Sequence, residues 1–180
     1  MEKIFYTDKN AFSSSEEAVK RILSDFFGLK KNKILRNEHG KPYLENCEER
    51  SLHFSVTHTK KRLYIAFCDK NVGIDAEPFQ REVPHYPLIV RRFAIEEQEE
   101  IHDIHDFLIH WAVKESVVKW LGSSIAHDIK EIAYVDHQVH YGIFALHVTI
   151  AQHEHEGNLL CVCSENDFKN AEFIALHNTD

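Results

Sequence analysis

The chain has 180 residues, of which 43% are hydrophobic and 28% charged, with a formal net charge of −8. This composition supports a packed core in one globular domain or two small fused halves, and the negative charge argues against a protein that coats nucleic acid phosphates. No run approaches the roughly 18 to 20 apolar residues that cross a bilayer, and the first residues lack a signal-peptide pattern. We therefore expect a cytoplasmic protein that binds neither nucleic acid nor membrane.

The first half of the chain predicts one helix followed by three strands. Residues 15–28 carry Ser15 as a candidate N-cap, acidic residues in the first turn, apolar positions at helical spacing and Gly28 as a stop. Runs at 52–57, 63–68 and 72–77 have the composition of strands. Pro78, Pro84 and Pro87 then mark an irregular connection.

The second half repeats this order. Helical patterns around 88–104 and from about 106 to 121 precede strand patterns near 130–136, 143–150 and 158–163, and the sequence HEHE at 153–156 reads as a polar hairpin turn. The echo predicts an α+β fold with two pseudo-symmetric halves, each a helix packed on a small antiparallel sheet. We place the halves at residues 1–84 and 85–180, together forming one compact unit.

The four cysteines do not indicate a metal or disulfide framework. Cys47, Cys68, Cys161 and Cys163 have no paired CxxC spacing, so we expect reduced, packed side chains. His102 and His105 share a helix face, but no cysteine or third histidine accompanies them at ligand spacing, so a zinc site is not expected there.

Two acidic side chains stand on one face of the strand at 72–77. Asp75 and Glu77 are two residues apart, so in extended backbone both leave the same side. Like charges repel unless a cation lies between them or water surrounds both. The pair therefore indicates either a divalent-cation site or a strand end that reaches solvent.

The long helix places a third acid on its inward face. Its apolar stripe includes Leu108, Trp111 and Val118, and Glu115 interrupts it. A carboxylate in a packed seam costs several kcal/mol unless it is paired or bound to metal. Lys119, at i+4, offers an ordinary helix-surface pair. Alternatively, Glu115 joins the two strand acids in an all-oxygen site for Mg²⁺ or Mn²⁺, which usually holds a phosphate-bearing substrate.

Four ordered motifs together carry a family resemblance. They are GKPYL at 40–44, FSVTHT at 54–59, GIDAE at 73–77 and WAVKESVVKWLG at 111–122. In this order and spacing the chain resembles the 4'-phosphopantetheinyl transferases, over roughly residues 15–165, and within them the Sfp-type (group II), whose single chain holds two pseudo-repeated halves. The resemblance implies transfer of 4'-phosphopantetheine from coenzyme A to a serine of an acyl or peptidyl carrier protein, with release of adenosine 3',5'-bisphosphate.

The resemblance also implies roles for individual residues. Asp75, Glu77 and Glu115 match the ligands of Mg²⁺, with Mn²⁺ a possible substitute, and Glu115 also matches the group that takes the serine proton directly or through water. Lys119 matches the lysine that stabilises the leaving phosphate. Lys119 and its neighbour Lys114 match residues that contact the phosphates of coenzyme A, and Lys41, Thr57 and His58 match residues that bind its nucleotide end.

One segment departs from the family pattern. Family members usually carry an arginine-rich segment before the first helix, whereas YTDKNAFSSSEE offers only Lys9. Nucleotide binding then shifts to other cations, for which Lys30, Lys31, Lys33 and Arg36 are the candidates.

We expect a monomer whose carrier partner is acidic. Because the chain is acidic too, attraction must come from a local basic rim, for which Arg91, Arg92 and the KKR sequence at 60–62 are the candidates. Two alternatives remain open: a non-catalytic scaffold of the same fold that binds coenzyme A or a carrier, and a metal-dependent phosphoesterase.

Overall fold

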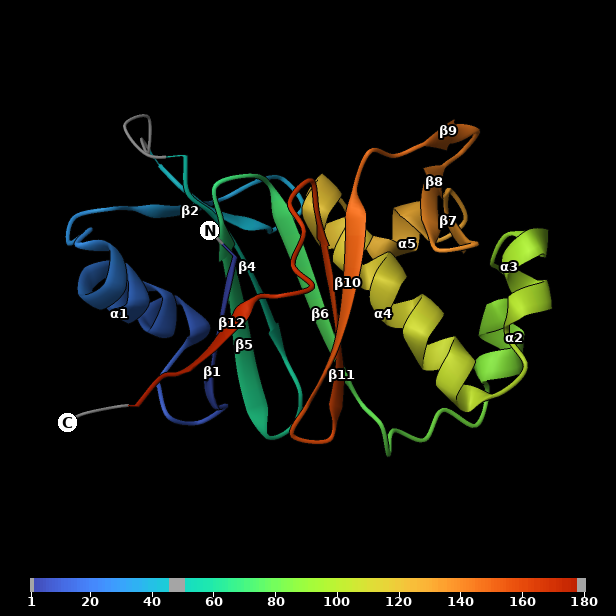
Figure 1. Cartoon of the computed structure of the whole chain (residues 1–180), viewed down its shortest axis with the longest axis horizontal. Coiled ribbons are helices and arrows are strands. Elements are labelled where there is room, and N and C mark those ends of the chain that lie inside the picture. Colours follow the sequence, from blue (N-terminus) through green and yellow to red (C-terminus); the bar gives the residue numbers. More distant parts are fainter. Residues whose placement is uncertain (1, 46–50, 178–180) are drawn as a thin grey trace.

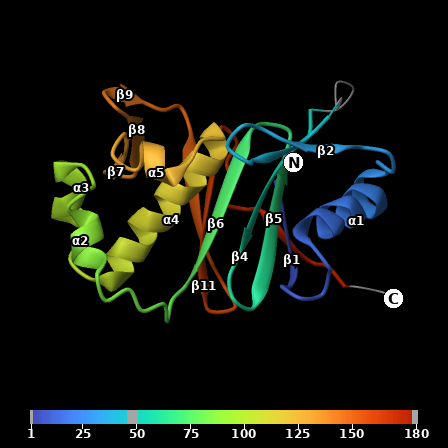
Figure 2. The same ribbon diagram turned by 180° about the vertical axis from the view of Figure 1, so that it is seen from behind.

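Two β-sheets lie between two helices in a computed structural model that describes residues 2–45 and 51–177 (Figures 1 and 2). Along the longest axis the layers are α1, the first sheet, the second sheet and α4. The α+β class predicted from the sequence is confirmed. Cys47 lies outside the described residues, and Cys68, Cys161 and Cys163 are free thiols, as expected.

The first layer pair is α1 on a four-stranded sheet. Helix α1 (Ser15–Phe27) begins at Ser14, whose side chain accepts from the backbone N–H of Glu17, and ends at Gly28 with φ 68°. The cap is therefore one residue earlier than predicted, because Ser14 has the extended backbone that an N-cap needs. The sheet has the order β12-β1-β5-β4 and comprises β1 (Lys3–Asp8), β4 (His53–His58), β5 (Arg62–Cys68) and β12 (Glu172–Ala175). Strands β1 and β12 pair in parallel and the other neighbours are antiparallel.

The second layer pair is α4 on a three-stranded antiparallel sheet. The sheet has the order β10-β11-β6 and comprises β6 (Val72–Pro78), β10 (Thr149–His155) and β11 (Asn158–Ser164). Helix α4 (Ile104–Leu121) begins at Asp103, whose side chain accepts from two backbone N–H groups, and ends at Gly122 with φ 74°. The hairpin predicted between the strands before and after 153–156 is present, but its turn lies later than predicted: β10 continues to His155, and the turn is formed by Glu156 and Gly157, both with positive φ.

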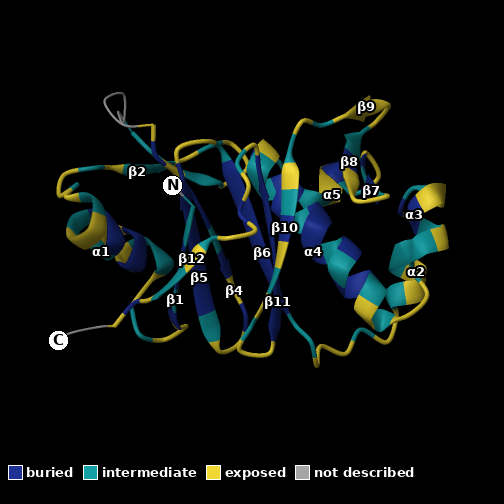
Figure 3. Ribbon diagram, in the orientation of Figure 1, coloured by how far each residue is buried: buried dark blue, intermediate teal, exposed yellow. Residues whose placement is uncertain are grey.

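Strand alternation divides the apolar residues into separate cores. On β5, Tyr64 and Ala66 face the second sheet, whereas Leu63, Ile65 and Phe67 face α1. On β6, Ile74 and Ala76 face the first sheet, which leaves the intervening side chains on the side of α4. Figure 3 shows β6, β11 and the inner face of α4 as a largely buried block.

Strand pairing crosses the division that we place at residue 84. Strand β6 belongs by sequence to the first half but pairs with β11, and β12 belongs by sequence to the second half but pairs with β1. The two-half organisation stays a prediction, and the exchange of these strands ties both segments into one unit.

Smaller elements complete the chain. They are β2 (Ile34–Arg36), β3 (Pro42–Leu44), α2 (Tyr86–Val90), α3 (Ile95–Glu100), α5 (Ile125–Asp128), β7 (Ile132–Val135), β8 (Gln138–Tyr141) and β9 (Phe144–Ala145). The single strand predicted at 143–150 is divided into β9 and the start of β10. Within the described residues, no helix combines the length and apolarity that a membrane span requires.

Candidate active site

The candidate site lies where β6 of the second sheet meets β4 of the first. Ser55 on β4 accepts from the backbone N–H of Ile74 at 3.1 Å. Two residues further on, Thr57 donates its hydroxyl to Oδ1 of Asp75 at 3.0 Å. Asp75 and Glu77 are only 7% and 6% exposed, so they are not a solvated strand end. Two buried acids on one strand face require compensating partners.

A glycine on β6 brings α4 against these carboxylates. A Cβ at Gly73 would lie 1.9 Å from the carbonyl oxygen of Ser116 and 2.5 Å from the backbone nitrogen of Trp120. Real Cβ atoms do not approach other atoms so closely, so the helix can reach this strand only where the side chain is a hydrogen. The close approach places the middle of α4, including Glu115 and Lys119, beside Asp75.

Lys119 bridges the helix and the strand. Its Nζ lies 2.7 Å from Oδ1 of Asp75 and 3.0 Å from the carbonyl oxygen of Ile74. The ion pair with Asp75 joins residues 44 positions apart, so Lys119 makes a tertiary contact that helix spacing alone did not predict. The ammonium is thus held at the acidic pair on the strand.

Glu115 shares the electrostatic field of the strand carboxylates. Burial, and secondly the charge of Asp75, raise the pKa of Glu115 to about 7, and Glu77 adds to the effect while Lys119 and Arg81 oppose it. Burial also raises the pKa of Glu77, against an ion pair with Arg81. The three carboxylates therefore form one interacting group drawn from a strand and a helix.

The donor chemistry of this group fits a hard divalent cation. Three carboxylates supply only oxygen ligands, which suit Mg²⁺ or Mn²⁺. However, the side chains do not form a closed cage: among the described residues, the only three potential ligands whose donor atoms all lie within 4.8 Å of one another are Glu2, Cys68 and Asp69. Asp75, Glu77 and Glu115 would have to turn their carboxylates inward to share one ion.

Two cavities open on either side of the carboxylates. One, of about 720 Å³, is lined by residues that include Lys9, His58, Asp75, Glu77 and Arg81. The other, of about 270 Å³, is lined by residues that include Lys41, Glu115, Lys119, Ser123 and Ser124. We refer to the two cavities together with the three carboxylates as the cleft; its cationic side chains include Lys9 and Arg81 in the larger cavity and Lys41 and Lys119 in the smaller one.

Lys41 marks the edge of the smaller cavity near the end of α4. Its Nζ donates to Oδ1 of Asn71 at 2.8 Å and to the carbonyl oxygen of Trp120 at 3.1 Å. Both partners are neutral, and burial lowers the pKa of Lys41 to about 8. An ammonium without an anionic partner among these contacts is suited to receive one from a ligand.

Of the predicted coenzyme A residues, Thr57 and His58 lie at the carboxylates and Lys114 does not. Thr57 is buried against Asp75, and the exposed His58 lines the larger cavity. Lys114 is fully buried on another face of α4, with its Nζ 2.7 Å from the equally buried Glu97. The predicted phosphate contact is therefore not available to Lys114 in this conformation, because the side chain leaves the helix away from the cleft.

The roles of three residues of the site were not predicted from the sequence. Gly73 was recognised as part of GIDAE, but only the tertiary contact reveals that it admits α4. Arg81 pairs with Glu77 from the irregular segment after β6, where no periodic pattern predicts side-chain direction. Asn71 orients Lys41 from the turn before β6. The spacing of four from Glu77 to Arg81 was the only available signal.

Comparison with known proteins finds a family match that includes the strand and the helix of the candidate site. Residues 71–169 match the model of the 4'-phosphopantetheinyl transferase superfamily. The chain belongs to this superfamily. The matched span contains β6 and α4, which carry Asp75, Glu77, Glu115 and Lys119.

One curated relative of this superfamily member is the L-aminoadipate-semialdehyde dehydrogenase-phosphopantetheinyl transferase of Xenopus laevis. It is 24% identical over 151 residues, an alignment that covers 73% of this chain and 49% of the relative. The chain thus spans about half the length of the curated relative it matches.

Proposed function

We propose that the protein is an Sfp-type 4'-phosphopantetheinyl transferase, which moves the phosphopantetheine group of coenzyme A to a serine of an acyl or peptidyl carrier protein. The observation that carries this proposal is the meeting of Asp75 and Glu77 on β6 with Glu115 and Lys119 on α4. Membership of the superfamily supports the same reaction.

Each step of the reaction has a candidate group in the cleft. The serine oxygen attacks the phosphorus that carries pantetheine, a new P–O bond forms, and the pyrophosphate P–O bond breaks to release adenosine 3',5'-bisphosphate. Glu115 accepts the serine proton directly or through water, as a carboxylate general base within hydrogen-bond reach of a hydroxyl does. Lys119 donates to the phosphate oxygens on which negative charge develops.

The carboxylates would also hold the cofactor. Asp75, Glu77 and Glu115 would hold Mg²⁺, or Mn²⁺ in its place, and the ion would neutralise charge on the pyrophosphate. Asp75 is already oriented for this by the hydroxyl of Thr57.

The edges of the cleft supply candidates for the rest of coenzyme A. Lys41 and His58 line the two cavities beside the carboxylates and would bind the phosphates of the nucleotide. Lys9, which lines the larger cavity, is also in reach of that region. Lys9 would thus do part of what the arginine-rich segment of other family members does, because the predicted substitutes Lys30, Lys31, Lys33 and Arg36 line neither cavity.

A carrier-modification assay tests the proposed function. The protein is incubated with coenzyme A, Mg²⁺ and an unmodified carrier, and the carrier is weighed by mass spectrometry. A phosphopantetheine adduct supports the proposal, no change supports a scaffold, and coenzyme A breakdown without an adduct supports a phosphoesterase. Glu115→Gln should lower transfer on the order of 10²-fold or more, whereas Glu154→Gln, on the exposed side of β10, should have no effect.

A further inference from the structure

We propose that Lys114 and Glu97 form an internal ion pair that positions Glu115 for catalysis and makes no contact with substrate. The inference rests on the proposed function, because it assigns Glu115 to the reacting centre. It gives a role to two charged side chains that are both 0% exposed.

Lys114 is held from several sides at once. Its Nζ lies 2.7 Å from Oε2 of Glu97, donates to the carbonyl oxygen of Ile129 at 3.2 Å and to that of Ile132, and lies 4.4 Å from the ring centroid of Phe93. Burial lowers its pKa, against the attraction of Glu97. These contacts connect α4 to α3, to Phe93 before it, and to Ile129 and the start of β7.

Glu97 completes the network from α3. Its Oε1 lies 3.3 Å from Nδ1 of His110, and its Oε2 accepts from the backbone N–H of Ala94 at 3.3 Å. His110, one turn before Lys114 on α4, also lies 3.7 Å through Nε2 from Glu100. The short helix α3 is thereby attached to α4 at two successive turns, through a single buried carboxylate.

The network fixes the position of α4 on the side that faces away from β6. Figure 1 shows α4 between β6 on one side and α2 and α3 on the other. Lys114 and Glu115 are consecutive, so their side chains leave the helix about 100° apart. A slide or rotation of α4 against α3 would consequently shift Glu115 relative to Asp75. Gly73 provides close contact on one face of the helix, and Lys114 provides the anchor on another.

Removing one partner should have a larger effect than removing both. A buried charge left alone carries its full desolvation cost, whereas two apolar side chains of similar volume are often tolerated in place of a buried ion pair. A residue that contacts phosphate would behave differently, because its effect would not depend on Glu97. The coupling between the two positions therefore distinguishes positioning from substrate contact.

A double-mutant cycle tests the inference with Lys114→Met, Glu97→Leu and the double variant. Each single variant should lower kcat on the order of 10²-fold through misplacement of Glu115, with the KM for coenzyme A unchanged. Each single variant should also bind Mn²⁺ about tenfold more weakly. Binding is measured from the loss of the electron paramagnetic resonance signal of the free ion. The double variant should recover most of both losses. All assays are run well below the melting temperature of each variant.

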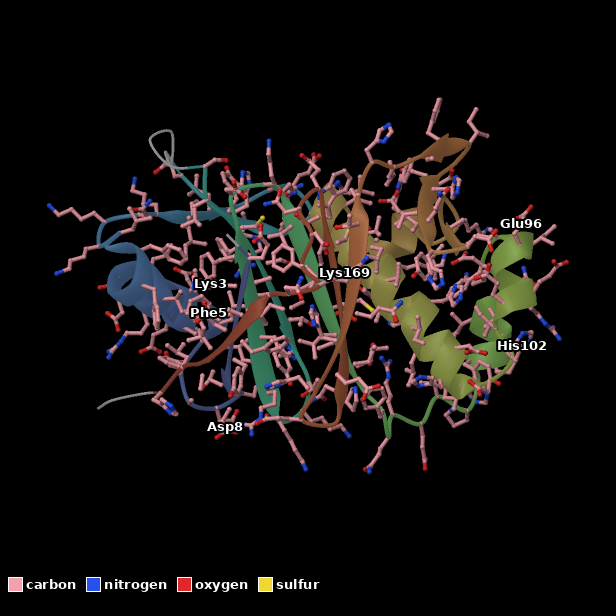
Figure 4. The ribbon with its side chains drawn as sticks, in the orientation of Figure 1. Lys3, Phe5, Asp8, Glu96, His102 and Lys169 are labelled. Carbon is pink, nitrogen blue, oxygen red and sulfur yellow. The ribbon has the colours of Figure 1, made fainter. Side chains whose placement is uncertain are left out.

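Glu96→Gln is the matched control. Glu96 lies on the exposed outer side of the same short helix (Figure 4), and this variant should keep wild-type kcat and Mn²⁺ binding.

An increase in the KM for coenzyme A in Lys114→Met alone, or additive losses in the double variant, would overturn the inference. If the wild-type protein modifies no carrier, the proposed function fails, and the Mn²⁺ cycle alone then decides whether the pair positions Glu115. If the single variants are too unstable to assay, the double variant decides whether Lys114 contacts substrate: an unchanged KM for coenzyme A supports the inference, and a raised KM in a folded double variant refutes it.

Discussion

Lys119 and Thr57 share one oxygen of Asp75: the ammonium lies 2.7 Å and the hydroxyl 3.0 Å from Oδ1. These three residues come from α4, β4 and β6, so a single carboxylate oxygen joins both sheets and the long helix. A cation bound by Asp75 would compete with the Lys119 ammonium for this oxygen. The contributions of the metal and of the lysine to phosphate transfer can therefore be tested separately.

Replacing Lys119 should separate transfer from metal binding. In Lys119→Met, carrier modification should fall on the order of 10²-fold, because the donor to the leaving phosphate is lost. Mn²⁺ binding should be retained or become tighter, because the competing ammonium is gone. Calorimetric titration with Mn²⁺ and mass spectrometry of the carrier provide the two measurements. Lys119 would be reassigned to a structural role if transfer persisted at the wild-type rate.

Adding one methyl group at Gly73 should push α4 away from β6. Gly73→Ala places a Cβ against the backbone of Ser116 and Trp120, so α4 must move, at a cost of about 1 to 3 kcal/mol in unfolding free energy. Mn²⁺ binding should weaken because Glu115 moves away from Asp75. Denaturant unfolding and Mn²⁺ titration measure the two effects.

A second glycine provides the control for strain alone. Gly157→Ala, in the β10–β11 turn at φ 75° with open space around its Cβ position, should lose about 1 kcal/mol of stability but retain Mn²⁺ binding. Equal effects of the two substitutions on Mn²⁺ binding would contradict the role given to Gly73.

Nucleotide binding should take up protons through Lys41. The pKa of this lysine is about 8 in the free protein because of burial, and a bound phosphate dianion would raise it. The charged form binds better, so affinity for adenosine 3',5'-bisphosphate should be greatest below pH 8 and decline as the pH rises above it. Calorimetry at pH 8 in buffers of different ionisation enthalpy should report proton uptake.

The proton uptake should vanish in Lys41→Met. Lys20→Met, which removes an exposed lysine of α1 paired with Glu16, should behave like the wild type. Unchanged proton uptake in Lys41→Met would show that another group binds the phosphate.

Carrier association should depend on the basic turn between β4 and β5. Lys60 and Lys61 line a cavity of about 750 Å³ at this turn. Arg62, by contrast, is already paired with Asp8 and Glu156. Asp8 lies at the same end of the sheet as this turn (Figure 4). Lys60→Gln/Lys61→Gln should raise the KM for an acidic carrier and reduce its salt dependence, with the KM for coenzyme A unchanged.

The exposed arginines after α2 offer a second part of the same rim. Arg91→Gln/Arg92→Gln should act in the same direction if the carrier spans both halves. Carrier kinetics measured between low and high salt distinguish the two pairs, and identical kinetics in all variants would remove the basic rim from the proposal.

Local patterns predicted most of the elements around the site. The helices that became α1 and α4 and the strands that became β4, β5 and β6 follow from apolar periodicity and capping residues, because these signals act over a few neighbouring residues. Strands β1 and β12 escaped prediction. They pair with each other across most of the chain length, and no local signal encodes such a partner.

The direction of side chains on α4 required the tertiary structure. The sequence placed Lys114 and Lys119 beside Glu115 and suggested phosphate contact for both. In the folded protein Lys119 reaches Asp75, whereas Lys114 enters the interior toward Glu97. Helical spacing gives the angle between side chains, but which face meets the sheet depends on packing against β6 and β7.

The sequence by itself determined the chemistry available to this protein: oxygen ligands on a strand, a third acid on a helix, and lysines near them. Residue type and spacing along one element suffice for that. Only the tertiary structure decided which of these groups meet, because contacts such as Gly73 with α4 and Glu97 with Lys114 join segments that no local interaction brings together.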